Sequence, residues 1–273
     1  MPTIQNGSVS LHVEDTGGDG RPVVLIHGWP LSGASWADTV PALTAAGLRV
    51  ITYDRRGFGD SDPAPDGRYD YDALTADLAA LLDDLDLRDV SLVGFSMGGG
   101  EVARYLGTHG QDRVSSVVFA AAIPPWLLRR DDTPDGGLPR SDAEGMQQGL
   151  REDREAFLEE FMTNFFSAGG ELRITEGQRQ AALRLAAQAD LDAAVACIGS
   201  WLEDFTEDVA SITVPTLVIH GDSDAIVPFE VSGQRTHDAI PGSELVVVES
   251  GPHGINVSHA QEFNDALVAF LTR

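Results

Sequence analysis

Short apolar runs alternate with stretches of helical spacing through the first half of the chain. The apolar runs predict strands at residues 23–28, 49–54, 90–96 and 113–123. Helical spacing is found at residues 36–47, 70–87 and 98–110. The second of these helices places five leucines on one face: Leu74, Leu78, Leu81, Leu82 and Leu85. Apolar strands separated by helices predict a mostly parallel sheet that is covered by helices on both faces.

The pattern changes after the pair Pro124-Pro125. From residue 126 to about residue 210 the sequence has no apolar run of the strand type. A charged, turn-rich stretch comes first at residues 128–142, followed by helix-prone stretches at 154–166 and 176–202. Strand signals return at 214–221 and 244–250, and a helix is expected at 260–271. We therefore expect a core domain of residues 1–125 and 211–273, interrupted by a helical cap insertion of residues 126–210.

The sequence Gly-Phe-Ser-Met-Gly at residues 94–98 stands between a predicted strand and a predicted helix. This is the G-x-S-x-G pattern in the context that it requires. Small residues at Gly94 and Gly98 permit a sharp turn that exposes the hydroxyl of Ser96. The N-terminus of the following helix favours negative charge beside it. We predict that Ser96 is a nucleophile.

Serine is a weak nucleophile at neutral pH and needs a general base. With this motif, the acid and then the histidine follow the serine along the chain. His253 lies in Ser-Gly-Pro-His-Gly, directly after the strand at 244–250. The nearest alternative, His259, stands at the start of a helix, so we predict that His253 is the base.

Two aspartates that follow the strand at 214–221 compete for the role of the acid. Asp222 comes one residue after Gly221, and Asp224 comes three residues after it. We favour Asp224, which holds the imidazole in the correct tautomer. Asp222 is expected to satisfy the amides of the turn.

An oxyanion hole needs two backbone N–H groups. The residue after the nucleophile, Met97, supplies one of them. The second is expected from Trp29, in the loop His-Gly-Trp-Pro that follows the strand at 23–28. We expect His27 to have a structural role, because it precedes Ser96 in the chain.

Charge and composition exclude several classes of function. The net charge is −25, and all 18 basic residues are arginine, which argues against a nucleic-acid partner. No apolar run approaches the roughly 18 residues of a membrane span, and no signal peptide is visible. The one cysteine, Cys197, forms no disulfide within the chain, which indicates a reducing, cytoplasmic location.

Together, these residues resemble the α/β-hydrolase superfamily over essentially the whole chain. The resemblance implies an eight-stranded, mostly parallel sheet with helices on both faces. Five stretches of the chain point to a narrower group within this superfamily: HGWP, GFSMGGGEVARY, AAIPP, PTLVIHGDSDAIVP and PHGINVSHAQEFN. They resemble the cofactor-free bacterial haloperoxidases, also called perhydrolases, and the aryl esterases related to them.

This resemblance implies hydrolysis of carboxylic esters through an acyl-enzyme. Water then releases a carboxylic acid, whereas hydrogen peroxide releases a peracid that can oxidise halide. No metal, haem or other cofactor is expected, and the partners are a small ester or carboxylic acid with water or peroxide. Assembly into a homo-oligomer is left open. Halide oxidation as the physiological role is the main alternative; a C–C bond hydrolase and a non-catalytic binding protein are disfavoured.

Seven residues are expected to bind substrate. Four come from the helical insertion, which should cover the site, and two follow Asp224 in positions that face the site in relatives of this kind. The complete set is Phe95, Phe157, Phe161, Phe165, Trp201, Ile226 and Val227.

Overall fold

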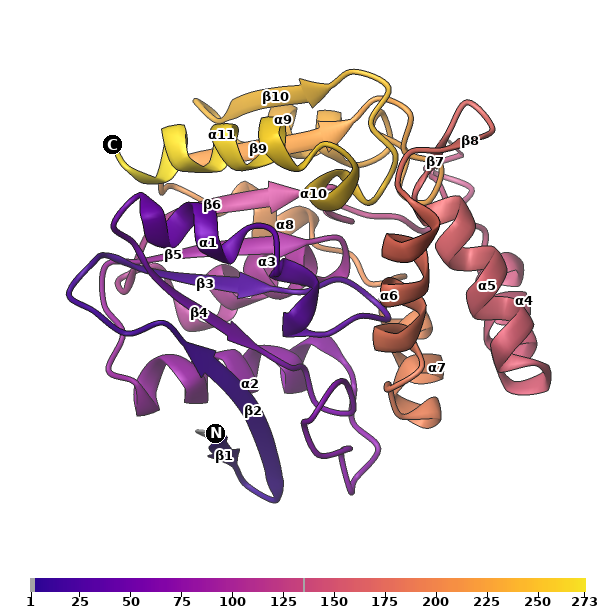
Figure 1. Cartoon of the computed structure of the whole chain (residues 1–273), viewed down its shortest axis with the longest axis horizontal. Helices are drawn as coiled ribbons and strands as arrows, with labels where there is room; N and C mark the ends of the chain where they lie inside the picture. Colours follow the sequence, from indigo (N-terminus) through magenta and orange to yellow (C-terminus); the bar gives the residue numbers. More distant parts are fainter. Residues whose placement is uncertain (1–2, 135) are drawn as a thin grey trace.

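The structure of the protein, a computed structural model, describes residues 3–134 and 136–273. One eight-stranded sheet runs through it in the order β1-β2-β4-β3-β5-β6-β9-β10 (Figure 1). The strands are β1 Thr3–Asn6, β2 Val9–Asp15, β3 Pro22–Ile26, β4 Arg49–Tyr53, β5 Val90–Phe95, β6 Val114–Ala120, β9 Thr216–Gly221 and β10 Glu244–Val248. Neighbouring strands from β4 to β10 are parallel, whereas β2 is antiparallel to both β1 and β4. The predicted fold class is confirmed.

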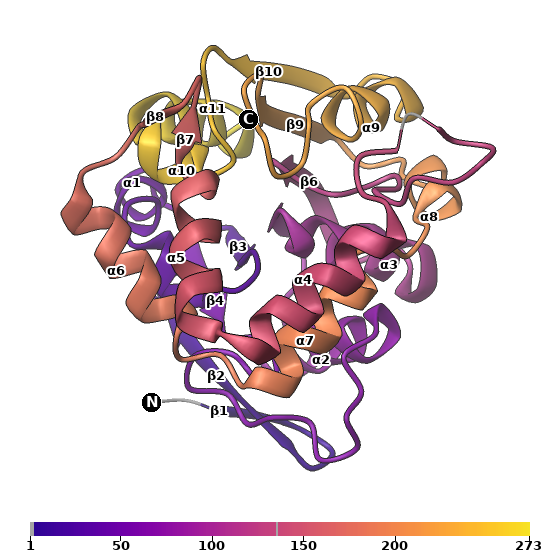
Figure 2. The ribbon, with the colours of Figure 1, turned by 90° about the vertical axis from the view of Figure 1, so that its right-hand side faces the viewer.

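Helices cover both faces of the sheet (Figures 1 and 2). On one face lie α1 Val40–Ala45, α10 Ile255–Ser258 and α11 Ala260–Leu271. On the other lie α2 Tyr71–Asp84, α3 Met97–His109, α8 Thr206–Ala210 and α9 Gly233–Ala239. Because both faces are covered, a central strand such as β3 is apolar along its length, and Val23 to Ile26 are completely buried.

The helix α2 illustrates why the predicted stripe forms a helix. Asp70 caps it, since its carboxylate accepts a hydrogen bond from the backbone N–H of Ala73. Four of the five leucines on the predicted face are completely buried, and Leu85 at the end of the helix is half-buried. The apolar stripe therefore points into the core, and the helix ends where the stripe reaches the surface.

The insertion between β6 and β9 carries most of its helices across the carboxyl ends of the strands (Figure 2). These are α4 Arg140–Glu152, α5 Arg154–Phe165, α6 Glu176–Ala186 and α7 Leu191–Ser200. We call residues 126–210 the cap segment. Its last helix, α8, packs against α3 in the layer beside the sheet. No helix in the described part of the chain is both long and apolar enough to cross a membrane.

Several predicted elements differ from the observed ones. The helix expected at 36–47 is divided into the short 3-10 helix η1 Gly33–Trp36 and α1, because Pro41 is tolerated only in the first turn of a helix. The helix expected at 176–202 is divided into α6 and α7, because Asp190 caps a new helix.

The cap segment also holds two elements that the sequence pattern did not predict. A hairpin joins β7 Ser167–Ala168 to β8 Glu171–Leu172, so the expectation of no strand in this segment is wrong. The turn consists of Gly169 and Gly170, both with positive φ, and strands of two residues are too short to show alternation. The helix α4 was missed because its side chains are mostly polar and only Ala143 and Leu150 are buried.

Candidate active site

Ser96 occupies the sharp turn between β5 and α3. Its backbone has φ 54° and ψ −119°, a conformation that residues with side chains rarely adopt. A Cβ atom on Gly94 would lie 2.5 Å from the carbonyl oxygen of Gly98, and one on Gly98 would lie 2.6 Å from that of Ile26. Glycine is therefore required at both positions for the strand and the helix to approach each other this closely. The turn holds Ser96 at the carboxyl edge of the sheet.

Ser96, His253 and Asp224 form a continuous chain of hydrogen bonds. The Oγ atom of Ser96 lies 2.9 Å from Nε2 of His253, and Nδ1 of His253 lies 2.6 Å from Oδ2 of Asp224. A carboxylate only accepts hydrogen bonds, so Nδ1 carries the proton and Nε2 is left as the acceptor for the serine hydroxyl. All three side chains are buried. The structure thus brings together the three residues that the sequence predicted as nucleophile, base and acid.

The second oxygen of Asp224 is held by its own turn. Oδ1 accepts hydrogen bonds from the N–H groups of Ile226 at 2.9 Å and Val227 at 2.8 Å. Burial alone raises the pKa of Asp224, but the charge of His253 and the hydrogen bonds to the carboxylate outweigh burial and bring this pKa well below its ordinary value. Asp222 was expected to satisfy the amides of this turn, and that prediction is wrong, because its exposed carboxylate accepts, among the described residues, only from the hydroxyl of Ser223.

The loop that carries Trp29 lies directly against the nucleophile. A Cβ atom on Gly28 would lie 3.1 Å from Cβ of Ser96, and the Trp29–Pro30 peptide bond is cis. Within the described residues, the backbone N–H groups of Trp29 and Met97 donate no hydrogen bond. The hydroxyl of Tyr71 donates to the carbonyl of Met97 at 2.9 Å and so fixes the first turn of α3. Two backbone donors without acceptors therefore stand beside Ser96.

Buried polar contacts of His27 and Arg55 support the loop that carries Trp29. His27 is completely buried; its Nδ1 donates to the Gly28 carbonyl at 2.9 Å, and its Nε2 accepts from the Arg55 amide at 3.0 Å. Burial, together with the charge of Arg55, lowers the pKa of His27 well below its ordinary value. The guanidinium of Arg55 donates to the His27 carbonyl at 2.7 Å and forms a buried ion pair with Glu101. These contacts give His27 a structural role.

A cavity of about 340 Å³ opens beside Ser96. Its wall is mostly apolar. It is built from the carboxyl edge of the sheet, the cap segment, and the turn at residues 222–228 that carries Asp224, which we call the acid turn. The lining residues are Trp29, Ser96, Ile123, Leu127, Gly137, Leu138, Met146, Phe157, Glu160, Phe161, Asn164, Trp201, Ala225, Ile226, Val227 and Pro228. Five of the seven residues expected to bind substrate are among them: Phe157, Phe161, Trp201, Ile226 and Val227.

Phe95 and Phe165 do not line this cavity, which corrects the expectation for both. Their rings pack on His253, with ring centroids 5.3 Å away for Phe95 and 4.7 Å away for Phe165. The ring of Phe95 also packs against the ring of Trp36, with 6.0 Å between the ring centroids. These rings bury the imidazole instead of facing the substrate cavity.

Several lining residues escaped the sequence analysis. Glu160 and Asn164 lie on α5, one helical turn from Phe157 and Phe161, so helical spacing was a signal that could have found them. Leu138 and Met146 come from the turn-rich stretch and from α4, where no local pattern indicates a cavity wall.

His220 is a further polar residue beside the acid that sequence reasoning did not assign. Its Nε2 atom lies 3.2 Å from Oδ2 of Asp224. The signal was its position four residues before Asp224, at the end of a buried strand.

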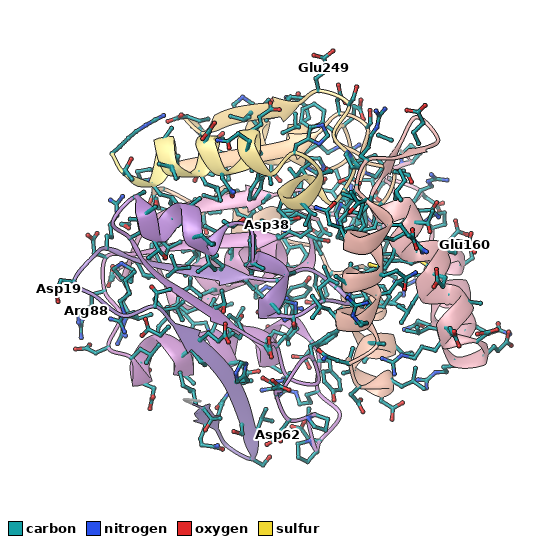
Figure 3. The ribbon with its side chains drawn as sticks, in the orientation of Figure 1. Asp19, Asp38, Asp62, Arg88, Glu160 and Glu249 are labelled. Carbon is teal, nitrogen blue, oxygen red and sulfur yellow. The ribbon has the colours of Figure 1, made fainter. Side chains whose placement is uncertain are left out.

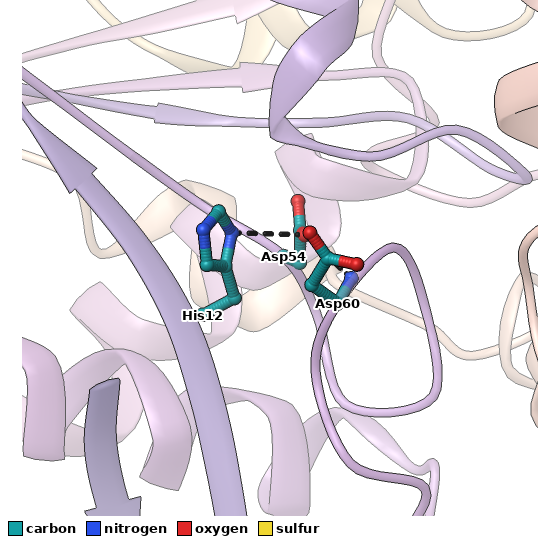
Figure 4. A group of neighbouring side chains, drawn as sticks. All are labelled: His12, Asp54 and Asp60. Carbon is teal, nitrogen blue, oxygen red and sulfur yellow. Dashed lines mark hydrogen bonds and ion pairs between the residues drawn. The ribbon is translucent and has the colours of Figure 1, made fainter. Parts of the chain in front are cut away.

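A second polar cluster lies away from Ser96, at the end of β4 (Figure 4). His12, Asp54 and Asp60 present ligand atoms within 4.8 Å of one another, with Nδ1 of His12 3.2 Å from Asp54. The carboxylate of Asp54, however, already accepts hydrogen bonds from the amides of Gly33 at 2.7 Å and Asp60 at 2.9 Å. The contacts of Asp54 support the loops around it, and nothing else at this cluster indicates a ligand.

Comparisons with known proteins agree with this geometry. The family model described as alpha/beta hydrolase fold matches residues 21–260. A non-heme chloroperoxidase of Kitasatospora aureofaciens is 43% identical over 94% of each chain. A bifunctional esterase/perhydrolase of Acinetobacter calcoaceticus is 33% identical over 96% of each chain. The crystal structure of a bromoperoxidase from Bacillus anthracis superposes with a TM-score of 0.96 at 50% identity, covering 100% of this chain and 99% of that one. As its motifs predicted, the chain belongs to the α/β-hydrolase family, among relatives that include non-heme haloperoxidases and an esterase.

Proposed function

We propose that the protein is a serine hydrolase that cleaves small carboxylic esters through an acyl-enzyme and also transfers the acyl group to hydrogen peroxide. The observation that carries the proposal is the hydrogen-bonded chain of Ser96, His253 and Asp224 beside an apolar cavity of about 340 Å³. A nucleophile, a base and an oriented acid in this order are what acyl transfer from an ester requires.

In the first half of the reaction, Ser96 attacks the ester carbonyl. His253 takes the hydroxyl proton at Nε2, and Asp224 stabilises the imidazolium through Nδ1. The free N–H groups of Trp29 and Met97 bind the oxyanion, because each lacks another acceptor in the described chain. His253 then gives its proton to the departing alcohol, which leaves an acyl group on Ser96.

In the second half, the acyl acceptor decides the product. His253 removes a proton from water to give a carboxylic acid, or from hydrogen peroxide to give a peracid, and Ser96 is regenerated in both cases. The relative from Acinetobacter calcoaceticus carries both activities in its name, which supports a single site for both acceptors.

Halide oxidation is a second candidate role, favoured by the relatives named as haloperoxidases. A released peracid oxidises a halide ion to the hypohalous acid and is itself reduced to the carboxylic acid. This step takes place after release, so the same residues serve both roles.

We expect the protein to act in the reducing cytoplasm, and its completely buried Cys197 is consistent with that location.

The test compares two reactions in the wild type and in Ser96→Ala. Hydrolysis of 4-nitrophenyl acetate and formation of peracetic acid from acetate and hydrogen peroxide are both expected in the wild type. Both should fall at least about 1,000-fold in Ser96→Ala, because the nucleophile is lost. Thermal melting of both proteins controls for folding.

Different results would contradict different parts of the proposal. Full activity in Ser96→Ala would overturn the mechanism. Ester hydrolysis without peracid above the background rate would leave an esterase and remove the peroxide reaction. Loss of activity on metal chelation would contradict the expectation that no metal takes part.

A further inference from the structure

His220 is a second histidine on the acid of the triad. It lies near the end of β9, is completely buried, and directs Nε2 toward the acid turn. Nε2 lies 2.8 Å from the carbonyl oxygen of Val227 and 3.2 Å from Oδ2 of Asp224. Oδ2 is the oxygen that accepts from His253. One carboxylate oxygen thus stands within hydrogen-bonding distance of two imidazoles.

The partners of His220 determine where its proton lies. A carbonyl and a carboxylate oxygen only accept, so Nε2 of His220 carries the hydrogen. Nδ1 has no hydrogen-bond partner in the described part of the chain, and a Cβ atom on Gly233 would lie 2.6 Å from it. A hydrogen on Nδ1 would be a buried donor without an acceptor, which is unfavourable. The contacts therefore make Nε2 the donor nitrogen of this ring.

His220 and Asp224 are also connected through hydrogen bonds to the backbone of Val227. His220 holds the Val227 carbonyl, and the Val227 amide holds Oδ1 of Asp224. The amide of Ser223, on the same turn, donates to the carbonyl of Gly251, two residues before His253. The acid turn is thereby fixed at both ends, relative to β9 and to the loop of the base.

We propose that His220 is a positioning residue, which fixes Oδ2 of Asp224 toward His253 and shares the charge of that oxygen. The inference rests on the function proposed above. Among the described residues, Asp224 is the titratable group within hydrogen-bonding distance of His220. The helix α9 packs the backbone of Gly233 against the ring of His220, and the ring of Phe229 lies 5.8 Å from it between centroids. His253 is faced by Asp224 and Ser96, and otherwise by aromatic rings.

The main test is His220→Phe, which keeps a ring and removes the donor. We expect kcat for 4-nitrophenyl acetate to fall about 10- to 100-fold, because small displacements of a catalytic group have effects of this size. KM should change less than about twofold. The acid limb of the kcat/KM profile should move to higher pH, because Asp224 without its second donor stabilises protonated His253 more strongly.

Two further variants make the result specific. His220→Gln can offer an amide N–H and should recover part of the lost kcat and return the acid limb toward its wild-type position. His237→Phe, at a half-buried histidine on the neighbouring helix α9, should leave both unchanged. Unchanged kcat in a folded His220→Phe protein would overturn the inference, and so would a loss of kcat with an unmoved acid limb.

The proposed function and the role of His220 would be contradicted by different results. Activity that survives in Ser96→Ala and His253→Ala would overturn the proposed function; activity lost in both but intact in His220→Phe would overturn only the role of His220. If His220→Phe does not fold, ¹⁵N NMR of histidine in the wild type still decides. His220 is expected to carry its ring hydrogen on Nε2, the nitrogen that faces the Val227 carbonyl and Asp224. A hydrogen on Nδ1 in place of Nε2 would contradict the inference.

Discussion

At the residue level, the site depends on buried polar side chains whose hydrogen bonds leave them one possible arrangement. Asp224 accepts through both oxygens, and His253 is left with one free acceptor, which faces Ser96. His27 is held in the same way between the Gly28 carbonyl and the Arg55 amide. Because both ring nitrogens of His253 and of His27 have defined partners, these two imidazoles are oriented before any substrate arrives.

The buried His27 predicts a loss of stability in mild acid. Burial lowers the pKa of His27 in the folded protein, whereas the unfolded chain takes up the proton near pH 6.5. Below about pH 6.5 the unfolded state binds more protons, so the free energy of unfolding falls by up to about 1.4 kcal/mol per pH unit. This loss should be absent above about pH 7.5 and reduced in His27→Gln.

Urea unfolding at several pH values, with His237→Gln as the control, measures this effect. The control should keep the wild-type pH dependence. An equal dependence in the wild type and His27→Gln would show that another group is responsible.

At the level of elements, the cap segment contacts the loop that carries Trp29 through aromatic rings. The ring of Trp29 packs edge-on against Phe161 of α5 at 4.9 Å between centroids and against Trp201 at 5.0 Å. Its indole N–H also donates to the carbonyl of Ala194 on α7 at 3.0 Å. The cap segment, which forms part of the cavity wall, thus also holds the residue that we propose as an oxyanion donor.

Phe161→Ala should widen the cavity and shift the acyl preference. We expect kcat/KM for 4-nitrophenyl butyrate relative to the acetate to rise about 3- to 10-fold, because roughly 0.8 kcal/mol is available for each additional buried methylene. Leu158→Ala is the matched control, since Leu158 is buried on the same helix but does not line the cavity.

Both variants are expected to lose about 2–5 kcal/mol of stability from the cavity that they create. Thermal melting and the two ester assays separate the effects. An equal shift of acyl preference in Leu158→Ala would mean that loosening the helix, and not widening the cavity, is responsible.

At the level of the whole molecule, the net charge is −25. Among the described residues that line the cavity, Glu160 is the one with a charged side chain. Glu160 is exposed on α5, and its carboxylate has no hydrogen bond or ion pair within the described residues (Figure 3). A substrate that carries a negative charge therefore approaches against both the net charge and a carboxylate at the cavity.

The enzyme should discriminate against anionic esters in a salt-dependent way. Raising the ionic strength from about 0.01 M to about 0.15 M shortens the screening length from roughly 30 Å to roughly 8 Å. It should raise kcat/KM for mono-4-nitrophenyl succinate but not for the acetate. Glu160→Gln should raise the succinate value about 2- to 5-fold, the range expected of one exposed charge.

Glu249→Gln is the control, because Glu249 is exposed at the end of β10 and does not line the cavity (Figure 3). Equal gains in both variants would assign the effect to net charge alone. A succinate rate that does not respond to salt would contradict the electrostatic explanation altogether.

Features that depend on residues close together in the chain could be predicted without the structure. The alternation of strands and helices, the glycines beside Ser96, and the placement of Asp224 and His253 after strands are all local patterns. Parallel strands bring their carboxyl ends to one edge, which is why residues 157 positions apart in the chain, Ser96 and His253, were predicted as partners and are hydrogen-bonded.

The contacts between side chains of different elements, in contrast, became visible only in the folded molecule. Phe95 and Phe165 cover His253 and do not line the cavity, while Leu138 and Met146 form its wall from segments without a telling pattern. The contact of His220 with Asp224 likewise depends on how the acid turn folds back on β9. The physical reason is that periodicity fixes which face of an element is apolar, whereas the partner of each buried side chain is set by the packing of elements distant in the chain.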